Sequence, residues 1–144
     1  MKMTYPVAQE YLGRVREAVR KVEQLEYREA NLRMLLTDTS VHLSDLPRSD
    51  SPDPQRHQTI HAEMDALERE IAAAGQELEK IREETGIMVC RLSRPTTQRI
   101  MLLYYFQNNR SWHEVAQELG YSKAQVFRYR DEGFAKLEKM LRAA

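Results

Sequence analysis

The sequence predicts an all-α protein, with a long antiparallel helical (coiled-coil) hairpin followed by a small domain of short helices. Only five glycines and five prolines occur in 144 residues, and these are the residue types that most disfavour a helix interior. Apolar residues repeat at alternating steps of three and four over two long segments. Two serine caps near the C-terminus then predict the starts of short helices.

The overall composition excludes two broad classes of chain. Hydrophobic residues make up 42% and the net charge is zero, whereas acidic disordered chains are poorer in apolar residues and far from neutral. The longest fully apolar run, residues 100–106, is much shorter than the ~20 residues of a membrane span. We therefore expect no membrane contact. The lone Cys90 can form no internal disulfide, so we also expect a cytoplasmic protein.

Proline positions divide the chain, since proline is tolerated at a helix start but not inside a helix. The prolines are Pro6, Pro47, Pro52, Pro54 and Pro95. They predict a first helix over 5–38, a flexible linker rich in Ser and Asp over 39–54, and a second helix over 55–91. The expected domains are therefore a hairpin, 1–91, and a C-terminal domain, 95–144.

Both long segments carry a seven-residue apolar pattern, which places those side chains on one stripe of each helix. We expect the stripe to close the hairpin. Because one stripe makes a narrow core, we also expect it to pair two hairpins in a homodimer. This dimerisation stripe comprises Val15, Val22, Leu25, Leu32, Leu67, Ile71, Leu78 and Ile81. The alternative is a single bundle in which both helices pack on the C-terminal block.

The zero net charge hides an asymmetry along the chain. Residues 47–91 carry six basic and ten acidic residues, a net of −4. Residues 92–144 carry nine basic and five acidic residues, a net of +4. A basic end on an acid-leaning body indicates that this end meets a polyanion.

The C-terminal block contains two capping boxes separated by a glycine. Ser111 and Glu114 open one helix, and Ser122 and Gln125 open the next. Gly120 lies between them, where the turn of a helix-turn-helix tends to need a positive φ. Apolar residues fill the positions that the motif directs inward, which are Val115, Ala116, Leu119, Val126 and Tyr129.

Aromatic residues near the motif predict its core. Tyr104, with Ile100 and Leu103, gives a preceding short helix an apolar face. Trp112, at the start of the next helix, is interpreted as a core residue rather than a base-stacking residue. Phe134 is expected to complete this core from the last helix.

The segment SWHEVAQELGYSKAQVFRYRDEGFAKLEKM resembles the C-terminal helix-turn-helix, region four, of bacterial sigma factors. With the preceding IMLLYYFQNNRSW it more closely resembles phage-encoded sigma-like helix-turn-helix proteins. These include the ArpU/RinA type of late-gene transcriptional regulators and a related phage family of unknown function. The resemblance covers residues 95–141. It implies DNA binding and transcription regulation for a phage or prophage inside a bacterial host cell, with the protein on the nucleoid when bound.

In a helix-turn-helix the second helix enters the major groove, and its first residues face the base edges. The expected base contacts are Ser122, Lys123, Ala124, Phe127 and Arg128. The expected phosphate contacts are Arg99, Arg110, Ser111, Gln125 and Arg130. Phe127 differs from the basic residue that is common at its position in the sigma-like family. It can meet a thymine methyl group or belong to the core.

No constellation in the sequence indicates catalysis. His57 and His61 are four residues apart but lack the further ligands of a structural zinc site. No Gly-rich phosphate loop and no Ser/His/Asp cluster is recognisable. We therefore expect no enzyme, no metal, no cofactor and no small-molecule substrate.

The function that the sequence favours is sequence-specific recognition of double-stranded DNA by a dimeric transcriptional regulator. One alternative is the small subunit of a phage terminase, which also joins a helix-turn-helix to an oligomerising hairpin but forms rings. Another is a sigma-like protein that binds RNA polymerase and touches DNA little.

Overall fold

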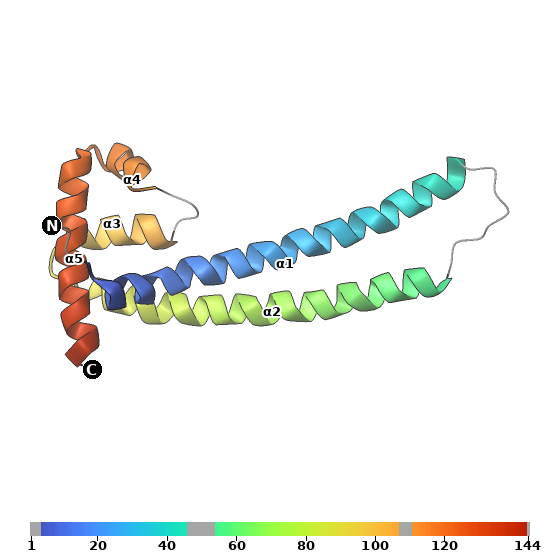
Figure 1. Ribbon diagram of the computed structural model, residues 1–144, viewed down its shortest axis with the longest axis horizontal. Helices are drawn as coiled ribbons and strands as arrows, with labels where there is room; N and C mark the ends of the chain where they lie inside the picture. The colour runs from blue at the N-terminus through green and yellow to red at the C-terminus, as the bar shows by residue number, and fades with distance from the viewer. Residues whose placement is uncertain (1–3, 46–53, 107–110, 144) are drawn as a thin grey trace. The chain divides into compact units, whose positions relative to one another are not determined.

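The computed structural model describes residues 4–45, 54–106 and 111–143, and all regular structure in these ranges is α-helical (Figure 1). The helices are α1 (Pro6–Asp45), α2 (Pro54–Cys90), α3 (Pro95–Phe106), α4 (Trp112–Leu119) and α5 (Lys123–Ala143). The expected all-α class is therefore confirmed. Within the described ranges, no helix is long and apolar enough to cross a membrane.

Proline begins three of the helices. Pro6, Pro54 and Pro95 each occupy the first position of a helix, where a backbone N–H would have no helical partner and a φ near −65° is already helical. The second long helix thus begins at Pro54, one position before the expected residue 55.

Helix α1 continues through Asp45, whereas the sequence predicted its end at residue 38. Residues 39–45 contain neither glycine nor proline, so nothing local stops the helix before them. The residue that precedes Pro47 is the first one biased away from helical backbone. The linker predicted over 39–54 was therefore too long, and its remaining part, 46–53, lies outside the described residues.

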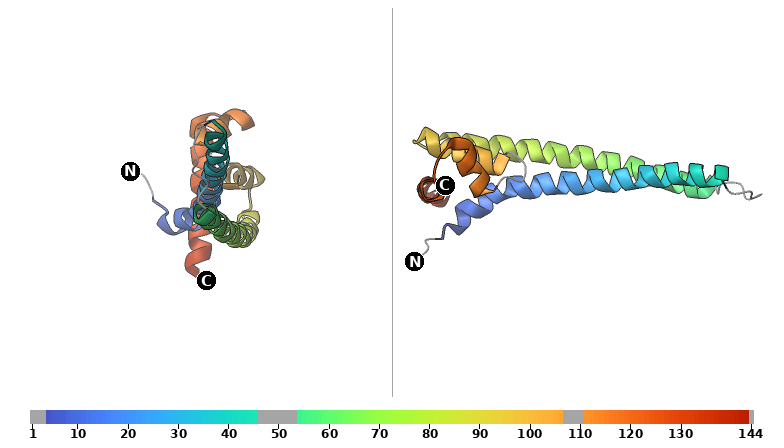
Figure 2. Two further views of the ribbon diagram at one scale, coloured as in Figure 1. Left: turned by 90° about the vertical axis from the view of Figure 1, so that its right-hand side faces the viewer. Right: turned by 90° about the horizontal axis from the view of Figure 1, so that it is seen from above.

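One compact unit of the chain is formed by Arg20–Glu77. In it α1 and α2 lie side by side (Figures 1 and 2). Its core consists of the buried Leu25, Leu67 and Ala74, with the partly buried Val22, Leu32 and Ile71 packed against them. The heptad pattern correctly predicts this packing of one long helix on the other. The same residues of the predicted dimerisation stripe are thus already in contact within one chain.

The other compact unit comprises Met1–Val19 and Leu78–Ala144. Its larger core joins α1 and α2 to the C-terminal helices. The buried members are Ala8, Leu12, Val89, Leu92, Met101, Tyr105, Phe134 and Leu137. Domains divided as 1–91 and 95–144 therefore do not match the packing, because the start of α1 and the end of α2 cover the apolar side of α5. These ends of the two long helices share a core with the C-terminal helices, as the alternative of a single bundle expects.

Three residues of the predicted stripe belong to this second unit. Val15 is fully buried, while Leu78 and Ile81 are half-buried. Val15 is therefore a core residue of its own chain, and its side chain offers no surface to a second copy.

Helices α3 and α5 approach each other closely at Gly133. A Cβ atom on Gly133 would lie 2.5 Å from Thr97 Cγ2 and 2.8 Å from Met101 Cε. Thr97 and Met101 are both buried, and the hydroxyl of Thr97 donates to the carbonyl of Tyr129 on α5 at 3.4 Å. Because Gly133 has no side chain, α3 can pack closely against the middle of α5.

Candidate nucleic-acid interface

A left-handed glycine joins α4 to α5. Gly120 has φ 73° and ψ 26°, a conformation that costs little only for glycine. Its N–H donates to the carbonyl of Gln117 at 3.3 Å, and the N–H of Tyr121 donates to the carbonyl of Ala116 at 3.0 Å. This is the Schellman pattern that ends a helix and satisfies its last carbonyls. The turn predicted from the sequence is confirmed.

Both predicted serine caps form. The N–H of Glu114 donates to Ser111 Oγ at 3.1 Å, at the start of α4. At the start of α5, the N–H of Gln125 donates to Ser122 Oγ at 3.2 Å and the N–H of Ser122 donates to Gln125 Oε1 at 3.1 Å. The second box is reciprocal, so it fixes both the first residue and the direction of α5.

A small apolar core lies where α3, α4 and α5 meet. Its buried members are Ile100, Leu103, Val115, Ala116 and Val126, with Tyr104, Trp112, Leu119 and Tyr129 packed against them. Ala116 is small where α4 and α5 meet, and Val126 is fully buried opposite it. All five inward positions predicted from the motif therefore belong to this core, and the helix-turn-helix geometry is present.

Trp112 belongs to the core and is not an exposed stacking residue. Its ring lies on that of Tyr104, with centroids 3.6 Å apart and planes 3° apart. It meets the rings of Tyr105 and Phe134 edge to face. Burial is the main reason that the pKa of Tyr105 is raised above its ordinary value. The sequence interpretation of Trp112 is confirmed.

The outer surface at the start of α5 carries most of the residues predicted to contact bases. Lys123, Ala124 and Arg128 are exposed there. Ser122 is exposed too, but its hydroxyl already serves the cap of α5. Phe127 is half-buried, with the guanidinium of Arg130 4.6 Å from its ring centre. Of the two roles left open for Phe127, this placement leaves only part of the ring for a thymine methyl group.

Arg130 is surrounded by aromatic rings and a carboxylate. Its Nε donates to Asp131 Oδ1 at 3.0 Å, and its side chain is only 24% exposed. The guanidinium also lies 5.2 Å from the ring centre of Trp112 and 5.8 Å from that of Phe134. Aromatic faces and a neighbouring carboxylate thus hold the cation within the fold, which favours a packing role for Arg130 over the predicted phosphate contact.

The other predicted phosphate contacts differ in their placement. Arg99 is exposed on α3 and lines a shallow depression with Tyr121 of the turn. Ser111 and Gln125 are exposed, and each also caps a helix. Arg110 lies outside the described residues. Arg99 is thus the predicted phosphate contact with an exposed cationic side chain in the described chain.

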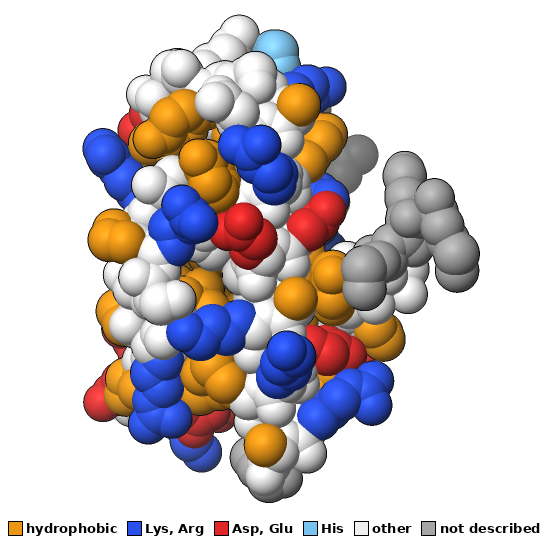
Figure 3. Space-filling view, turned by 90° about the vertical axis from the view of Figure 1, so that its left-hand side faces the viewer, with side chains coloured by type: hydrophobic (Ala, Val, Ile, Leu, Met, Phe, Trp, Pro, Cys, Tyr) orange, Lys and Arg blue, Asp and Glu red, His pale blue; other side chains and the backbone are white. Residues whose placement is uncertain are grey.

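The structure adds residues that the sequence did not single out. Arg94 lies in the turn before α3, and its guanidinium is 5.2 Å from the ring centre of Tyr129. Arg128 lies 5.4 Å from the same ring centre, and Tyr121 meets that ring edge to face. Arginines from two segments thus converge on one tyrosine. Figure 3 shows Lys and Arg side chains spread along this side of the molecule, with acidic side chains among them.

The one signal in the sequence is that Arg94 comes directly before Pro95, which predicts a position at the start of a helix. Its contact with Tyr129 depends on how α3 packs on α5, which local spacing does not encode.

Comparison with family models, with curated proteins and with solved structures finds no match to this chain.

Proposed function

We propose that this protein is a sequence-specific DNA-binding transcriptional regulator of phage or prophage origin, which reads the major groove with the start of α5. The observation that carries the proposal is the joint between α4 and α5. Gly120 and the cap at Ser122 fix the direction of α5, while Lys123 and Arg128 are exposed beside that joint. The phage origin rests on the sigma-like resemblance of residues 95–141.

The chemistry of this surface suits DNA. Lysine and arginine donate to O6 and N7 of guanine, and Ala124 can meet a thymine methyl group. Arg99 and Arg94 add exposed positive charge on the segments next to α5, where phosphate contacts would set the register of the helix on the duplex. The residues expected to contact bases and those expected to contact phosphates lie on or directly beside α3 and α5, which share the small core.

A second copy of the chain fits this proposal. In the unit of residues 20–77, the stripe residues Val22, Leu32 and Ile71 are only partly buried after α1 has packed on α2. Pairing two hairpins would cover these apolar faces, and two recognition helices would read two half-sites. A homodimer is therefore part of the proposal.

Selection of duplexes from a random pool, followed by fluorescence anisotropy, tests the proposal. We expect the selected duplex to bind at least about a thousandfold more tightly than a scrambled duplex. The double variant Lys123→Ala/Arg128→Ala should lose this preference. Lys21→Ala/Arg69→Ala, which removes two exposed charges from the other unit, should keep it.

Three results would overturn the proposal. Equal affinity of the wild-type protein for all duplexes would remove sequence reading. Capture of RNA polymerase without duplex binding would favour the sigma-like alternative. A ring of eight or more subunits that recruits a packaging enzyme would favour the terminase alternative.

A further inference from the structure

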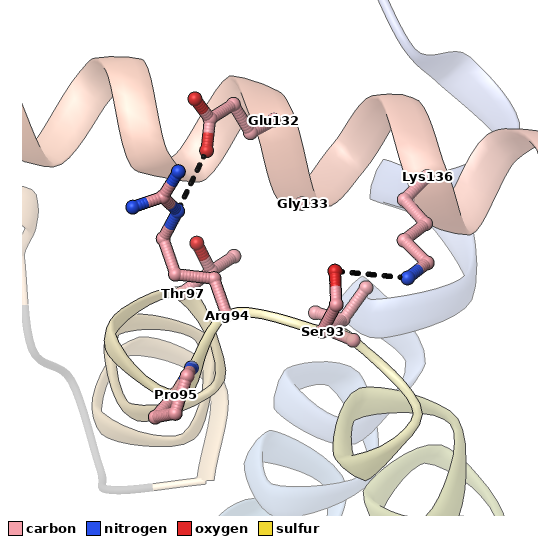
Figure 4. Close-up of a pocket in the computed structure, with 8 residues that line it drawn as sticks. Ser93, Arg94, Pro95, Thr97, Glu132, Gly133 and Lys136 are labelled. Carbon is pink, nitrogen blue, oxygen red and sulfur yellow. Dashed lines mark hydrogen bonds and ion pairs between the residues drawn. The ribbon is translucent and has the colours of Figure 1, made fainter.

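A hollow of about 390 Å³ lies between the turn into α3 and the middle of α5 (Figure 4). Ser93 and Arg94 come from the turn, and Glu132, Gly133 and Lys136 come from α5. Arg94 and Lys136 lie on either side of the hollow, which we call the Arg94–Lys136 hollow. Gly133, where α3 packs closely on α5, also lines it.

Each of the two cations has one contact with a neighbouring residue and keeps further N–H donors for a ligand. Arg94 Nε lies 3.2 Å from Glu132 Oε2, and Lys136 Nζ donates to Ser93 Oγ at 3.0 Å. Arginine has five N–H donors and an ammonium group has three, so each contact uses only part of the donor capacity. Two cations and one carboxylate leave the hollow with a net positive charge, which attracts an anion.

The hollow lies next to the exposed residues at the start of α5, the proposed recognition helix. Tyr129 separates them, since its ring centre lies 5.2 Å from the guanidinium carbon of Arg94 and 5.4 Å from that of Arg128. Arg128, Glu132 and Lys136 follow one another at steps of four on one face of α5. A duplex that meets Arg128 in its groove would therefore bring its backbone toward the hollow.

We propose that the Arg94–Lys136 hollow binds one phosphate group of the DNA backbone, with Arg94 and Lys136 donating to the same phosphate. The proposal rests on the function proposed above and adds a backbone contact outside the recognition residues. A guanidinium can bind a phosphate through two parallel N–H bonds, and an ammonium adds a point charge. Glu132 orients Arg94 and, as an anion beside the phosphate, weakens its binding.

The dependence of duplex affinity on salt tests the shared site. Each phosphate contact contributes about 0.9 to the slope of log K against log salt concentration. We expect Arg94→Gln/Lys136→Gln to lower the slope of the full-length protein by about this amount on both the selected and the scrambled duplex. Glu132→Gln should tighten both duplexes. A slope lowered twice as much would mean two separate phosphates and would overturn the shared site.

Lys139→Gln is the matched control, because Lys139 is exposed on the same helix but does not line the hollow. Circular dichroism should show that all variants retain their helices. A double variant with the slope of the wild-type protein, or a Lys139→Gln slope equally lowered, would overturn the site. Failure of the wild-type protein to bind any duplex would instead overturn the proposed function.

Inorganic phosphate provides the second arm of the experiment. If the hollow takes free phosphate rather than DNA, phosphate at constant ionic strength will raise the Tm of the wild-type protein and leave that of the double variant unchanged. The salt slope for duplex binding will then be the same in both proteins. That pair of results would overturn the backbone contact, whereas the lowered slope without a phosphate effect on the Tm supports it.

Discussion

Glu138, on α5, accepts a hydrogen bond of 2.7 Å at Oε2 from the backbone N–H of Ala8, in the first turn of α1, 130 residues away in the sequence. The N–H of Val7 donates to the other carboxylate oxygen at 3.3 Å. The first N–H groups of a helix have no partner within it, and they favour a negative charge. The carboxylate of Glu138 thus caps α1 from the last helix of the chain.

The first prediction concerns this cap. Burial of Glu138 raises its pKa, but the N–H groups of Ala8 and Val7, with Arg142, outweigh burial and lower the pKa below its ordinary value of 4.5. A lowered pKa in the folded state means that the carboxylate stabilises the protein above pH 4.5 and loses this effect as it becomes protonated at lower pH. Glu138→Ala should therefore lower the Tm at neutral pH, and the difference from wild type should shrink below pH 4.5.

Thermal melts of both proteins across this pH range provide the measurement. Glu83→Ala is the control, since Glu83 is an exposed carboxylate within α2 and should change the Tm little. A difference between Glu138→Ala and wild type that grows on acidification would show that the carboxylate does not act as an anionic cap.

Features set by local spacing or by a repeating apolar pattern could be predicted from the sequence, and contacts between distant segments without such a pattern could not. The left-handed turn at Gly120 follows from a glycine between two capping boxes. The packing of Leu25 on Leu67 follows from the heptad period. The cap that Glu138 gives to Ala8 joins opposite ends of the chain, and no spacing rule relates them.

Arg130 shows the same limit within the candidate site. Helical periodicity alone allowed it to point toward a phosphate. Phe127 and Phe134 lie three and four residues from Arg130 on the same helix, so helical spacing brings their rings near it. Trp112 comes from α4, and its contact with Arg130 depends on how α4 packs on α5.

The second prediction concerns the contact between α3 and α5. Gly133→Ala should lower the free energy of unfolding by up to about 2 kcal/mol, because overpacking costs about 1–3 kcal/mol while alanine gains about 1 kcal/mol in helix propensity. The stiff Thr97 Cγ2, 2.5 Å from the added Cβ, is the main obstacle. Thr97→Ser removes that methyl group and keeps the hydroxyl, so adding it should recover part of the loss.

Gly75→Ala provides the comparison for Gly133→Ala, measured by urea denaturation. A Cβ on Gly75 would meet nothing within 4 Å, so this substitution should stabilise the protein by about 1 kcal/mol. Equal effects of the two substitutions would mean that α3 and α5 do not approach closely at Gly133.

The third prediction concerns association through the stripe. Ile71 is half-buried on the stripe, whereas Met34 is 60% exposed on α1 and does not belong to the stripe core. Ile71→Glu should convert the proposed dimer to a monomer, because an unpaired buried carboxylate costs several kcal/mol. Met34→Glu should leave the dimer intact. Light scattering gives the masses, and circular dichroism checks that helicity is kept. The opposite pattern would place the dimer contact on the Met34 side of α1.

The last prediction separates Arg128 from Arg130 on DNA. Arg128 is exposed, so Arg128→Ala should cost about 1–3 kcal/mol on the selected duplex and much less on a scrambled one, as loss of a base contact does. Arg130→Ala should leave the salt slope unchanged, shift the fluorescence of Trp112, and lower stability by about 1 kcal/mol through the lost ring contacts. Anisotropy at several salt concentrations and urea denaturation followed by Trp112 fluorescence measure these effects. A lower salt slope for Arg130→Ala, with unchanged stability, would show that Arg130 leaves the aromatic faces to contact a phosphate when DNA binds.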